Sequence, residues 1–354
     1  MIQKIKICYL IDGLRLGGKE RQLMDLIKGL VNQSFLSPEQ IMIISFYKDG
    51  SMDEIFKKMS IQIKYSIRKF RKDIFLFFRL YKIVKEFSPN IIHTWDPMTT
   101  IYALPIAKLL KIKFINGFIR FAAPVKPFSK FWIVSKLTFK FSDLIIANSL
   151  SGLHSFNLKL SKKNYCIYNG FNFSRINTVE NPNEVKKRYL LKTKYIVGMV
   201  GNFVEAKDYE TYLMSAQNIL KKRCDVTFIC IGSGHTLRDM KKLIDPKYHD
   251  NIKFFGRVMD VESIINIFDI GVLICNTNGH AEGISNSIME YMAFGKPVIV
   301  TDSGGNKELV NNNKVGYIVK PFDQDELSEK INSLLNDKIK RIEMGKSGKE
   351  KIVN

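Results

Sequence analysis

Short apolar runs alternate with amphipathic stretches along the whole chain, and this pattern predicts strands and helices in turn. In the first half the runs are rich in Ile, Val and Phe and are bounded by Gly, Asn, Pro or Asp, as buried strands usually are. They occupy residues 4–11, 40–46, 90–95, 112–118 and 143–149. Helix-length segments lie between them, at Lys19–Asn32, Asp73–Phe87 and Pro97–Leu110.

The second half repeats this arrangement. Its predicted strands occupy residues 195–201, 225–232, 251–256, 269–275, 296–302 and 315–321. Alternating strands and helices predict parallel sheets with helices on both faces, so the chain should form two Rossmann-like, doubly wound α/β domains. The stretch from Phe173 to Val185 is polar and contains Pro182, which is typical of a connection. We therefore expect a first domain at residues 1–172, a linker at 173–190 and a second domain at 191–354.

The bulk composition is that of a soluble globular protein. Hydrophobic residues make up 45% and charged residues 25% of the 354 positions, and no apolar run approaches the length that spans a bilayer. The lysine-rich N-terminus followed by an apolar run resembles a signal peptide, but Asp12 interrupts the run, which favours a buried strand. The odd cysteine count and the absence of a CxxC pair predict that the thiols are buried and reduced, which suits a cytoplasmic location. The five cysteines are Cys8, Cys166, Cys224, Cys230 and Cys275.

The net charge of +21 is unevenly distributed. Residues 1–172 hold 28 Lys and Arg against 11 Asp and Glu, a net +17, while residues 173–354 hold 27 against 23, a net +4. This asymmetry predicts an anionic partner for the first half. The basic residues form no known nucleic-acid module, so we expect an anionic membrane surface and no nucleic acid.

Two segments, 64–85 and 126–140, interleave Lys and Arg with Phe, Tyr and Trp, as helices at a membrane interface do. They predict peripheral binding at the inner face of the cell membrane. The alternative is that the aromatic side chains face the core while the lysines are merely solvated.

Three short motifs carry little information alone. Gly13, Gly17 and Gly18 form a loop before a predicted helix, which suits either ligand approach or a plain strand-to-helix turn. The run Gly232-Ser233-Gly234 has Leu237 where a nicotinamide-binding fingerprint needs glycine. Asp323-Gln324-Asp325 imitates a metal-binding DxD motif, but an acidic first helical turn explains it, and no His/Cys cluster offers a metal site.

The segment from Cys275 to Asp302 is the most informative. A buried strand is predicted to end at Cys275, and a helix to begin near Ser285, a plausible N-cap. Glu282 and Glu290 stand at this helix entry, where carboxylates near an apolar strand need partners. Sugar hydroxyls suit them, and the free N–H groups of the helix start suit a diphosphate. Stabilisation of the helix dipole by acidic residues is the alternative.

This segment resembles the signature of the family 4 retaining glycosyltransferases, which have the GT-B fold. The family's E-x7-E motif is matched by Glu282 and Glu290, and the run after it by Gly295, Pro297 and 302–308. In the first half the match rests on Gly17-Gly18-Lys19-Glu20, IIHTWD and Tyr168-Asn169-Gly170. The resemblance implies two Rossmann-like domains facing across a cleft, an acceptor-side first domain and a nucleotide-sugar-binding second domain.

The resemblance also implies roles for single residues. Glu282 would bind the donor sugar hydroxyls and face the reacting carbon, and Lys207 would pair with the diphosphate and stabilise the leaving group. Glu290 would hold the ribose. The backbone at Ile284 and Ser285 would meet the phosphates, and Gly17 and Gly18 would give space beside donor and acceptor. Arg257 would lie near the base. The further donor-binding residues would be Gly283 and Asn286.

Two departures from the family pattern concern the phosphates and the acceptor. Asn202 stands where the family often has arginine, so Lys207 would carry more of the phosphate charge. Many relatives have a histidine closing the fifth strand of the first domain, where this chain offers Asn116 or Arg120. Together with His93, which follows the fourth strand, these are the candidates on the acceptor side.

The resemblance thus implies a retaining transferase that moves a sugar from a nucleotide diphosphate sugar, such as a UDP-sugar, to a hydroxyl acceptor, without metal or cofactor. The implied setting is bacterial cell-surface polysaccharide or lipid-linked saccharide assembly. A sugar-nucleotide epimerase and a catalytically silent binding partner remain alternatives. The chain ends in a helix-like segment where the family usually continues with a helix that crosses back to the first domain.

Overall fold

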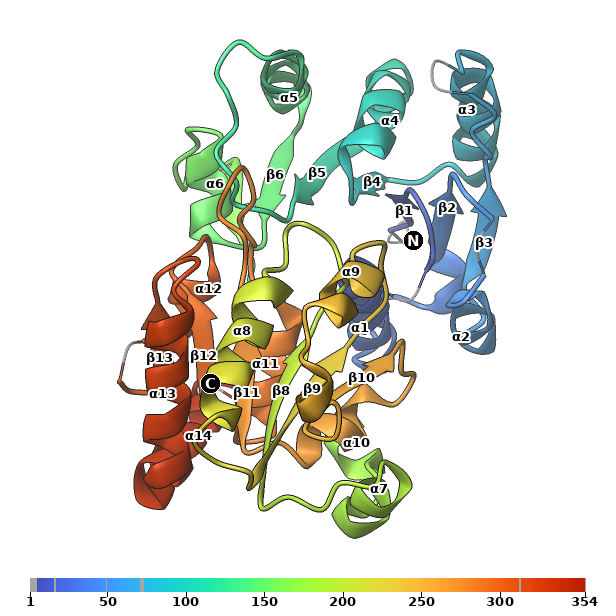
Figure 1. The fold of residues 1–354 in the computed structure, drawn as a ribbon. Coiled ribbons are helices and arrows are strands. Elements are labelled where there is room, and N and C mark those ends of the chain that lie inside the picture. The colour runs from blue at the N-terminus through green and yellow to red at the C-terminus, as the bar shows by residue number, and fades with distance from the viewer. Residues whose placement is uncertain (1–4, 16, 49, 71–72, 312, 354) are drawn as a thin grey trace. The chain divides into compact units, whose positions relative to one another are not determined.

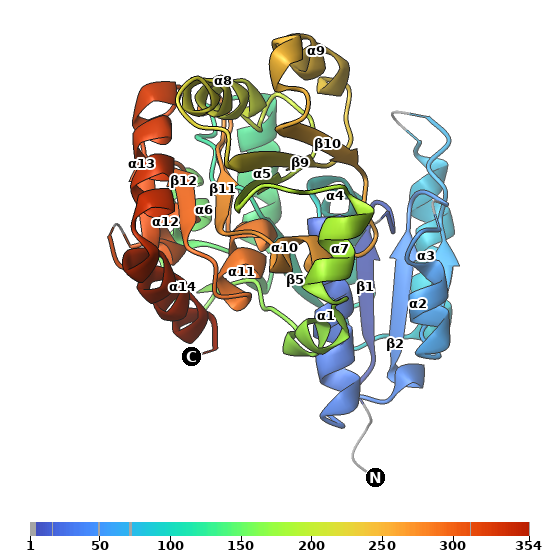
Figure 2. The ribbon, with the colours of Figure 1, turned by 60° about the horizontal axis from the view of Figure 1, so that its bottom comes forward.

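The computed structural model describes residues 5–15, 17–48, 50–70, 73–311 and 313–353. The chain divides into two compact units, Met1–Gly170 and Phe171–Asn354. Each unit contains a parallel sheet with helices packed on it (Figures 1 and 2), which confirms the prediction of two Rossmann-like domains. Among the described residues, no helix is both long and apolar enough to cross a membrane.

The sheet of the first unit has the strand order β3-β2-β1-β4-β5-β6-β7. The strands are β1 (Ile7–Ile11), β2 (Ile41–Ser45), β3 (Gln62–Tyr65), β4 (Ile91–Thr94), β5 (Lys113–Ile119), β6 (Leu144–Ala147) and β7 (Asn164–Cys166). The helices are α1 (Gly18–Asn32), η1 (Pro38–Gln40), α2 (Asp53–Lys58), α3 (Phe75–Phe87), α4 (Pro97–Leu109), α5 (Lys130–Phe141) and α6 (Leu150–Ser155).

Both faces of the first sheet are buried, because successive side chains of a strand point to opposite faces. In β1, Cys8 and Leu10 pack with the core side chains of α3 and α4, whereas Tyr9 and Ile11 pack with those of α1 and α2. Helix α4 packs between α3 and α5, so the three helices lie side by side on one face (Figure 1).

The sheet of the second unit has the order β10-β9-β8-β11-β12-β13. The strands are β8 (Tyr195–Val200), β9 (Val226–Ile231), β10 (Ile252–Gly256), β11 (Ile270–Leu273), β12 (Val298–Thr301) and β13 (Gly316–Val319). The helices are η2 (Phe173–Thr178), α7 (Pro182–Arg188), α8 (Tyr209–Leu220), α9 (Leu237–Lys242), η3 (Pro246–Tyr248), α10 (Val261–Asn266), α11 (Asn286–Ala293), α12 (Asn306–Leu309), α13 (Gln324–Asn336) and α14 (Lys338–Val353).

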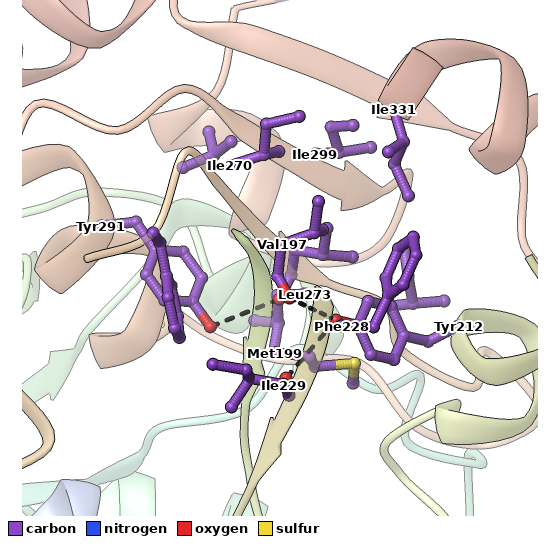
Figure 3. Packing of buried hydrophobic residues seen from close by; sticks show 14 of the residues in the cluster. Val197, Met199, Tyr212, Phe228, Ile229, Ile270, Leu273, Tyr291, Ile299 and Ile331 are labelled. Carbon is purple, nitrogen blue, oxygen red and sulfur yellow. Dashed lines mark hydrogen bonds between the residues drawn. The ribbon is translucent and has the colours of Figure 1, made fainter. Parts of the chain in front are cut away.

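Two tyrosines tie the helices of the second unit to its sheet (Figure 3). The hydroxyl of Tyr212, on α8, donates to the carbonyl of Val197 at 2.9 Å. The hydroxyl of Tyr291, on α11, accepts from the backbone N–H of Val200 at 2.7 Å. Because both rings are fully buried, these bonds fix the helices at defined positions over β8.

Some expectations need revision in detail. The stretch 173–190, expected to be a linker, forms η2 and α7 in the second unit, where Val185 is buried. Cys224 is exposed and Cys166 half-buried, so the prediction of five buried thiols was wrong for these two, which lie outside the core strands. The Asp323 side chain accepts a bond from the Glu326 N–H at the start of α13, which confirms its explanation as a helix start.

Candidate functional site

Each sheet has one point where the strand order reverses. In the first unit β2 and β3 lie on one side of β1, and β4 lies on its other side. In the second unit the corresponding point lies between β8 and β11. Ligands of open α/β sheets bind beyond the carboxyl ends of the strands at such points. The loops that follow β1, β4, β8 and β11 are therefore where side chains for chemistry should gather.

Two loops meet at the reversal point of the second unit. The loop after β8 and the loop after β11 are joined by an antiparallel bridge between Lys207 and Cys275. The N–H of Asp208 donates to the carbonyl of Ile274 at 3.0 Å, and the N–H of Asn276 donates to the carbonyl of Ala206 at 3.1 Å. Backbone pairing thus fixes the start of one loop against the end of the other.

This pairing brings the two expected catalytic side chains together. Lys207 Nζ lies 2.7 Å from Glu282 Oε1, with side-chain exposures of 12% and 30%. Burial lowers the pKa of Lys207, but the charge of Glu282 outweighs it and the pKa is raised overall, so the ammonium group stays charged at neutral pH. The result is an ion pair whose carboxylate remains accessible to solvent.

The start of α11 is held beside the end of β8. The Ser287 hydroxyl donates to the carbonyl of Val200 at 2.9 Å, and the Gly305 N–H donates to the carbonyl of Glu282 at 2.9 Å. Ser285 is the N-cap residue, yet its side chain makes no capping bond. Gly283, Ile284 and Ser285 are buried at this turn and Asn286 is half-buried. A helix start in this position favours an anion.

Glu290 has a partner that the sequence did not reveal. Its side chain is 4% exposed, and Glu290 Oε1 lies 2.9 Å from Arg175 Nη2, on η2. Arg175 Nε also donates to Glu262 Oε1 at 2.6 Å. Burial lowers the pKa of Arg175, but the charges of Glu290 and Glu262 raise it by more. A buried carboxylate needs a cationic partner, so such a partner could be expected from the sequence. Its identity could not, because Arg175 lies in a polar segment with no motif around it.

The other expected donor-side residues of this unit lie at the same edge of the sheet. Asn202 is exposed in the loop after β8, and Arg257 is exposed after β10, which β9 separates from β8. The glycines at 232 and 234 serve packing, since a Cβ on Gly232 would lie 1.9 Å from the carbonyl oxygen of Gly201. The structure therefore groups Lys207, Glu282 and the start of α11, with Arg257 further along the edge.

The reversal point of the first unit holds a second charged cluster. Lys19 Nζ donates to Asp12 Oδ1 at 2.5 Å and lies 4.0 Å from Asp96 Oδ2. Asp96 also accepts from the Thr99 N–H at the start of α4 and from the Asp12 N–H. Gly17 is the N-cap residue of α1, and Gly18 is the first residue of that helix.

The acceptor-side candidates divide into two places. His93, near the end of β4, and Arg120, after β5, both contact Trp95: the imidazole and indole centroids are 5.4 Å apart, and Arg120 Cζ lies 3.6 Å from the indole centroid. Asn116 lies in the middle of β5, fully buried, and donates to the Ser142 hydroxyl at 3.3 Å. The structure thus brings His93 and Arg120 together and leaves Asn116 apart from them.

Burial lowers the pKa values of both His93 and Arg120. Burial, together with the charge of Arg120, lowers the pKa of His93 to about 3, so the imidazole is neutral at pH 7. Burial lowers the pKa of Arg120 to about 9, which leaves the guanidinium charged. Within the described part of the chain, no three His, Cys, Asp or Glu residues are placed to hold a metal ion.

The chain is similar to known families and proteins along most of its length. Residues 181–351 match the family described as "Glycosyl transferases group 1", and residues 16–175 match "Glycosyltransferase Family 4". The chain is 28% identical over 305 residues to the capsular polysaccharide biosynthesis glycosyltransferase CapM of Staphylococcus aureus, covering 80% of this chain and 79% of that protein.

Two further proteins resemble the chain along most of its length. A UDP-Gal:α-D-GlcNAc-diphosphoundecaprenol α-1,3-galactosyltransferase of Escherichia coli is 24% identical over 304 residues, covering 80% of this chain and 76% of its own. The structure of Anabaena HepE in complex with UDP-glucose superposes with a TM-score of 0.82 at 18% identity, covering 98% of this chain and 94% of HepE. The fold of this chain is thus shared with a protein solved with a nucleotide sugar.

Proposed function

This chain belongs to the glycosyltransferases of group 1 and family 4, and we propose that it moves a sugar from a UDP-sugar to a hydroxyl of a saccharide or lipid-linked saccharide, with retention of configuration. The observation that carries the proposal is the Lys207–Glu282 ion pair at the reversal point of the second sheet, beside the start of α11. The Staphylococcus and Escherichia coli relatives, which assemble capsular and diphosphoundecaprenol-linked saccharides, support the acceptor class.

In the proposed mechanism, Lys207 binds the diphosphate together with the N–H groups at the start of α11. Both are fixed before the donor arrives, so they stabilise the charge that develops as the bond between the sugar and the diphosphate breaks. Glu282 then exchanges part of its contact with Lys207 for hydroxyls of the donor sugar. The acceptor hydroxyl attacks from the face that the diphosphate leaves, and its proton passes to the departing phosphate oxygen.

Glu290 is proposed to accept hydrogen bonds from the ribose hydroxyls. Arg175 orients this carboxylate, since its guanidinium donates a hydrogen bond to Glu290 Oε1 from a largely buried position. The remaining proposed donor contacts come from Gly17, Gly18, Asn202, Arg257, Gly283 and Asn286. The positive charge that the diphosphate needs comes from Lys207 and the helix start, so the proposal includes no metal ion or cofactor.

Thermal-shift measurements with UDP, GDP, ADP and their sugars test the donor, because a ligand that binds the folded state raises its stability.

We expect Lys207→Ala to weaken UDP binding by about 1–3 kcal/mol, the value of a charged hydrogen bond, and uridine binding little. Glu282→Gln should lower kcat by roughly 10²-fold, the scale of a lost electrostatic contact. Lys242→Ala, an exposed lysine on α9, is the control. Equal losses for UDP and uridine in Lys207→Ala would contradict the assignment.

We further propose that the first unit docks on an anionic membrane through α5 and α3. Helix α5 buries polar side chains and exposes apolar ones, the reverse of an ordinary surface helix. Ser135 and Thr138 are buried, while Ile133 and Leu137 are 52% and 56% exposed. Phe75 and Phe78 of α3 are also exposed, among the exposed or half-buried basic residues Arg68, Lys69, Lys82, Lys85, Lys126, Lys130, Lys136 and Lys140. Apolar side chains at the surface with cations around them fit the headgroup region of an anionic bilayer.

Part of the aromatic set faces the core instead, as the alternative interpretation held. Phe139 is 4% exposed, and Phe77 and Tyr81 are partly buried against the core of the first unit. Arg71 and Lys72, which belong to the same basic segment, lie outside the described residues. The proposed membrane contact therefore rests on the outer face of α5 and the start of α3.

Co-sedimentation with phosphatidylcholine vesicles, with and without phosphatidylglycerol, tests this contact across a salt series. Each Lys near the surface should contribute about 1 kcal/mol, so the double variant Lys130→Gln/Lys140→Gln should reduce binding strongly. Lys346→Gln/Lys349→Gln, on α14 of the second unit, removes the same charge as the control. Binding that is independent of lipid charge, or unchanged at high salt, would overturn the proposal.

A further inference from the structure

Several buried polar atoms of the first unit lack a hydrogen-bond partner in the described chain, and three of them belong to Trp95 and the two side chains that contact it. These three are Trp95 Nε1, Arg120 Nε and His93 Nε2. The indole ring contacts both of the other side chains. Buried polar groups are almost always bonded, so three unbonded ones around one indole ring, at the carboxyl ends of adjacent strands, indicate a place where a ligand supplies the partner.

This cluster carries the positive charge of Arg120. Among the described residues, no carboxylate lies within ion-pair distance of Arg120, although the more distant Glu20 acts to raise its pKa. Glu20 lies 3.8 Å from the ammonium of Lys19, which in turn bonds Asp12. A half-buried guanidinium without a counter-ion is costly, and an anion that bound it would remove that cost.

The donors of the cluster define what it accepts. The indole N–H and the guanidinium N–H groups can only donate, so their partner must be an acceptor. Arg120 Cζ lies over the Trp95 ring, 3.6 Å from its centroid, so the indole restrains the position of the guanidinium. His93 is neutral and adds no charge, and it fits against β5 only because residue 117 is glycine, where a Cβ would lie 2.5 Å from His93 Nε2.

We propose that Arg120 and Trp95 form a binding site for an anionic group, a phosphate or a carboxylate, carried by the saccharide substrate. The assignment to substrate rests on the proposed function, whereas the anion site itself rests on the geometry of the first unit. A phosphate would belong to a phosphate-linked acceptor, and a carboxylate to an acidic sugar. Both offer the planar or tetrahedral oxygen acceptors that a guanidinium binds in a fork.

The chain has only two tryptophans, Trp95 and Trp132, which allows a direct experiment. In the Trp132→Phe protein, labelled with ¹⁵N-tryptophan, the indole N–H resonance reports Trp95 alone. This protein is titrated with inorganic phosphate, with glucuronate and with neutral N-acetylglucosamine at constant ionic strength set by sodium chloride. We expect a saturable shift of the resonance with phosphate or glucuronate and none with N-acetylglucosamine. The anion that binds more tightly identifies the source.

Variants separate binding at this site from a general salt effect. Arg120→Gln should weaken the anion response at least tenfold, and Arg120→Lys should retain part of it. Lys113→Gln, at the other end of β5, removes an exposed charge and should leave the response unchanged. The proposal is overturned if neutral N-acetylglucosamine moves the resonance as far as the anions do, a comparison that needs no Arg120 variant, or if Arg120→Gln responds like its parent.

A Lys207→Ala background separates this inference from the proposed function. In that background the response of Trp95 to phosphate should persist, since Lys207 belongs to the second unit. Loss of UDP binding in every form of the protein, with the Trp95 response intact, would contradict the proposed function and leave the anion site standing. The reverse result would leave the donor site and remove the anion site.

Discussion

Arg175 joins two carboxylates that stand on different helices, and the stability of the second unit should depend on it. Glu290 comes from α11 and Glu262 from α10, and Arg175→Ala removes the guanidinium that pairs with both of these carboxylates. We expect Arg175→Ala to lower the free energy of unfolding by about 3 kcal/mol, the scale of a broken buried ion pair. Urea unfolding measures the loss.

The exposed pair Arg188–Glu180 provides the matched control for Arg175. Its side chains are 55% and 36% exposed, so Arg188→Ala should change stability little. Arg175→Ala should also weaken uridine binding, because Glu290 loses its fixed orientation. A variant that unfolds like the wild type and binds uridine normally would remove Arg175 from both roles.

His93 should make stability depend on pH. Its pKa is about 3 in the folded chain against an ordinary value of 6.5, so below pH 6.5 the unfolded chain takes up a proton that the folded chain does not. Stability contributed by the neutral imidazole is complete above pH 6.5 and is lost as the pH falls. At pH 5.5 the loss is about 1.4 kcal/mol.

Urea unfolding at pH 7.5 and pH 5.5 tests this pH dependence by comparing the wild type with His93→Gln. The wild type should lose about 1.4 kcal/mol more than the variant between the two values, since other groups titrate alike in both. Equal losses would show that His93 titrates in the folded protein as it does in the unfolded chain.

At the scale of elements, α14 packs on α11 through closely spaced glycines. A Cβ on Gly345 would lie 2.0 Å from the carbonyl oxygen of Gly295, so Gly345→Ala must push the two segments apart. We expect a loss of about 1–3 kcal/mol, the usual cost of overpacking. Because α11 carries Glu290, UDP binding should weaken as well.

Gly348 on the same helix is the control for this prediction. Its Cβ would lie 3.3 Å from Met292 Cγ and 3.8 Å from Met292 Cα, so no backbone atom comes as close as at Gly345. Gly348→Ala should therefore be neutral, or stabilising by up to about 1 kcal/mol, through the higher helix propensity of alanine. If both alanine variants behaved alike, the close contact at Gly345 would not limit the packing.

The sequence pattern predicted the central strands but missed two edge strands. The central strands β1, β2 and β8 read as apolar runs because both faces of a parallel sheet are covered. The edge strands β3 and β7 were not predicted, since residues such as Gln62, Lys64 and Tyr165 leave one side exposed and interrupt the apolar pattern. Such short edge strands are defined by pairing with a neighbour.

At the scale of the whole molecule, each unit has cores of its own, and this should be visible in unfolding. Among the residues that the structure describes, the second unit holds one large cluster of buried side chains and the first unit three smaller ones. We expect two calorimetric transitions in the full chain. UDP at about 100 times its Kd should stabilise the transition of the second unit by about 2.7 kcal/mol and leave the other in place.

One variant in each unit shows which unit each calorimetric transition belongs to. Gly345→Ala should lower the UDP-sensitive transition, and His93→Gln should affect the UDP-insensitive one. A single transition that UDP shifts as a whole would mean that the units unfold together.

The sequence by itself determined the fold class, the family and several members of the candidate site, because these depend on local order along the chain. Strand–helix alternation fixes a doubly wound sheet, and Glu282, Glu290 and Lys207 stand in local motifs. Tertiary structure alone decided which side chains meet. Lys207 and Glu282 are 75 positions apart and Arg175 and Glu290 are 115, and such contacts depend on how strands order themselves in a sheet. The same ordering left Asn116 inside β5 and placed Arg120 on Trp95, beyond ion-pair distance of every carboxylate of the described residues, because burial and partners come from neighbours that the chain supplies only after it folds.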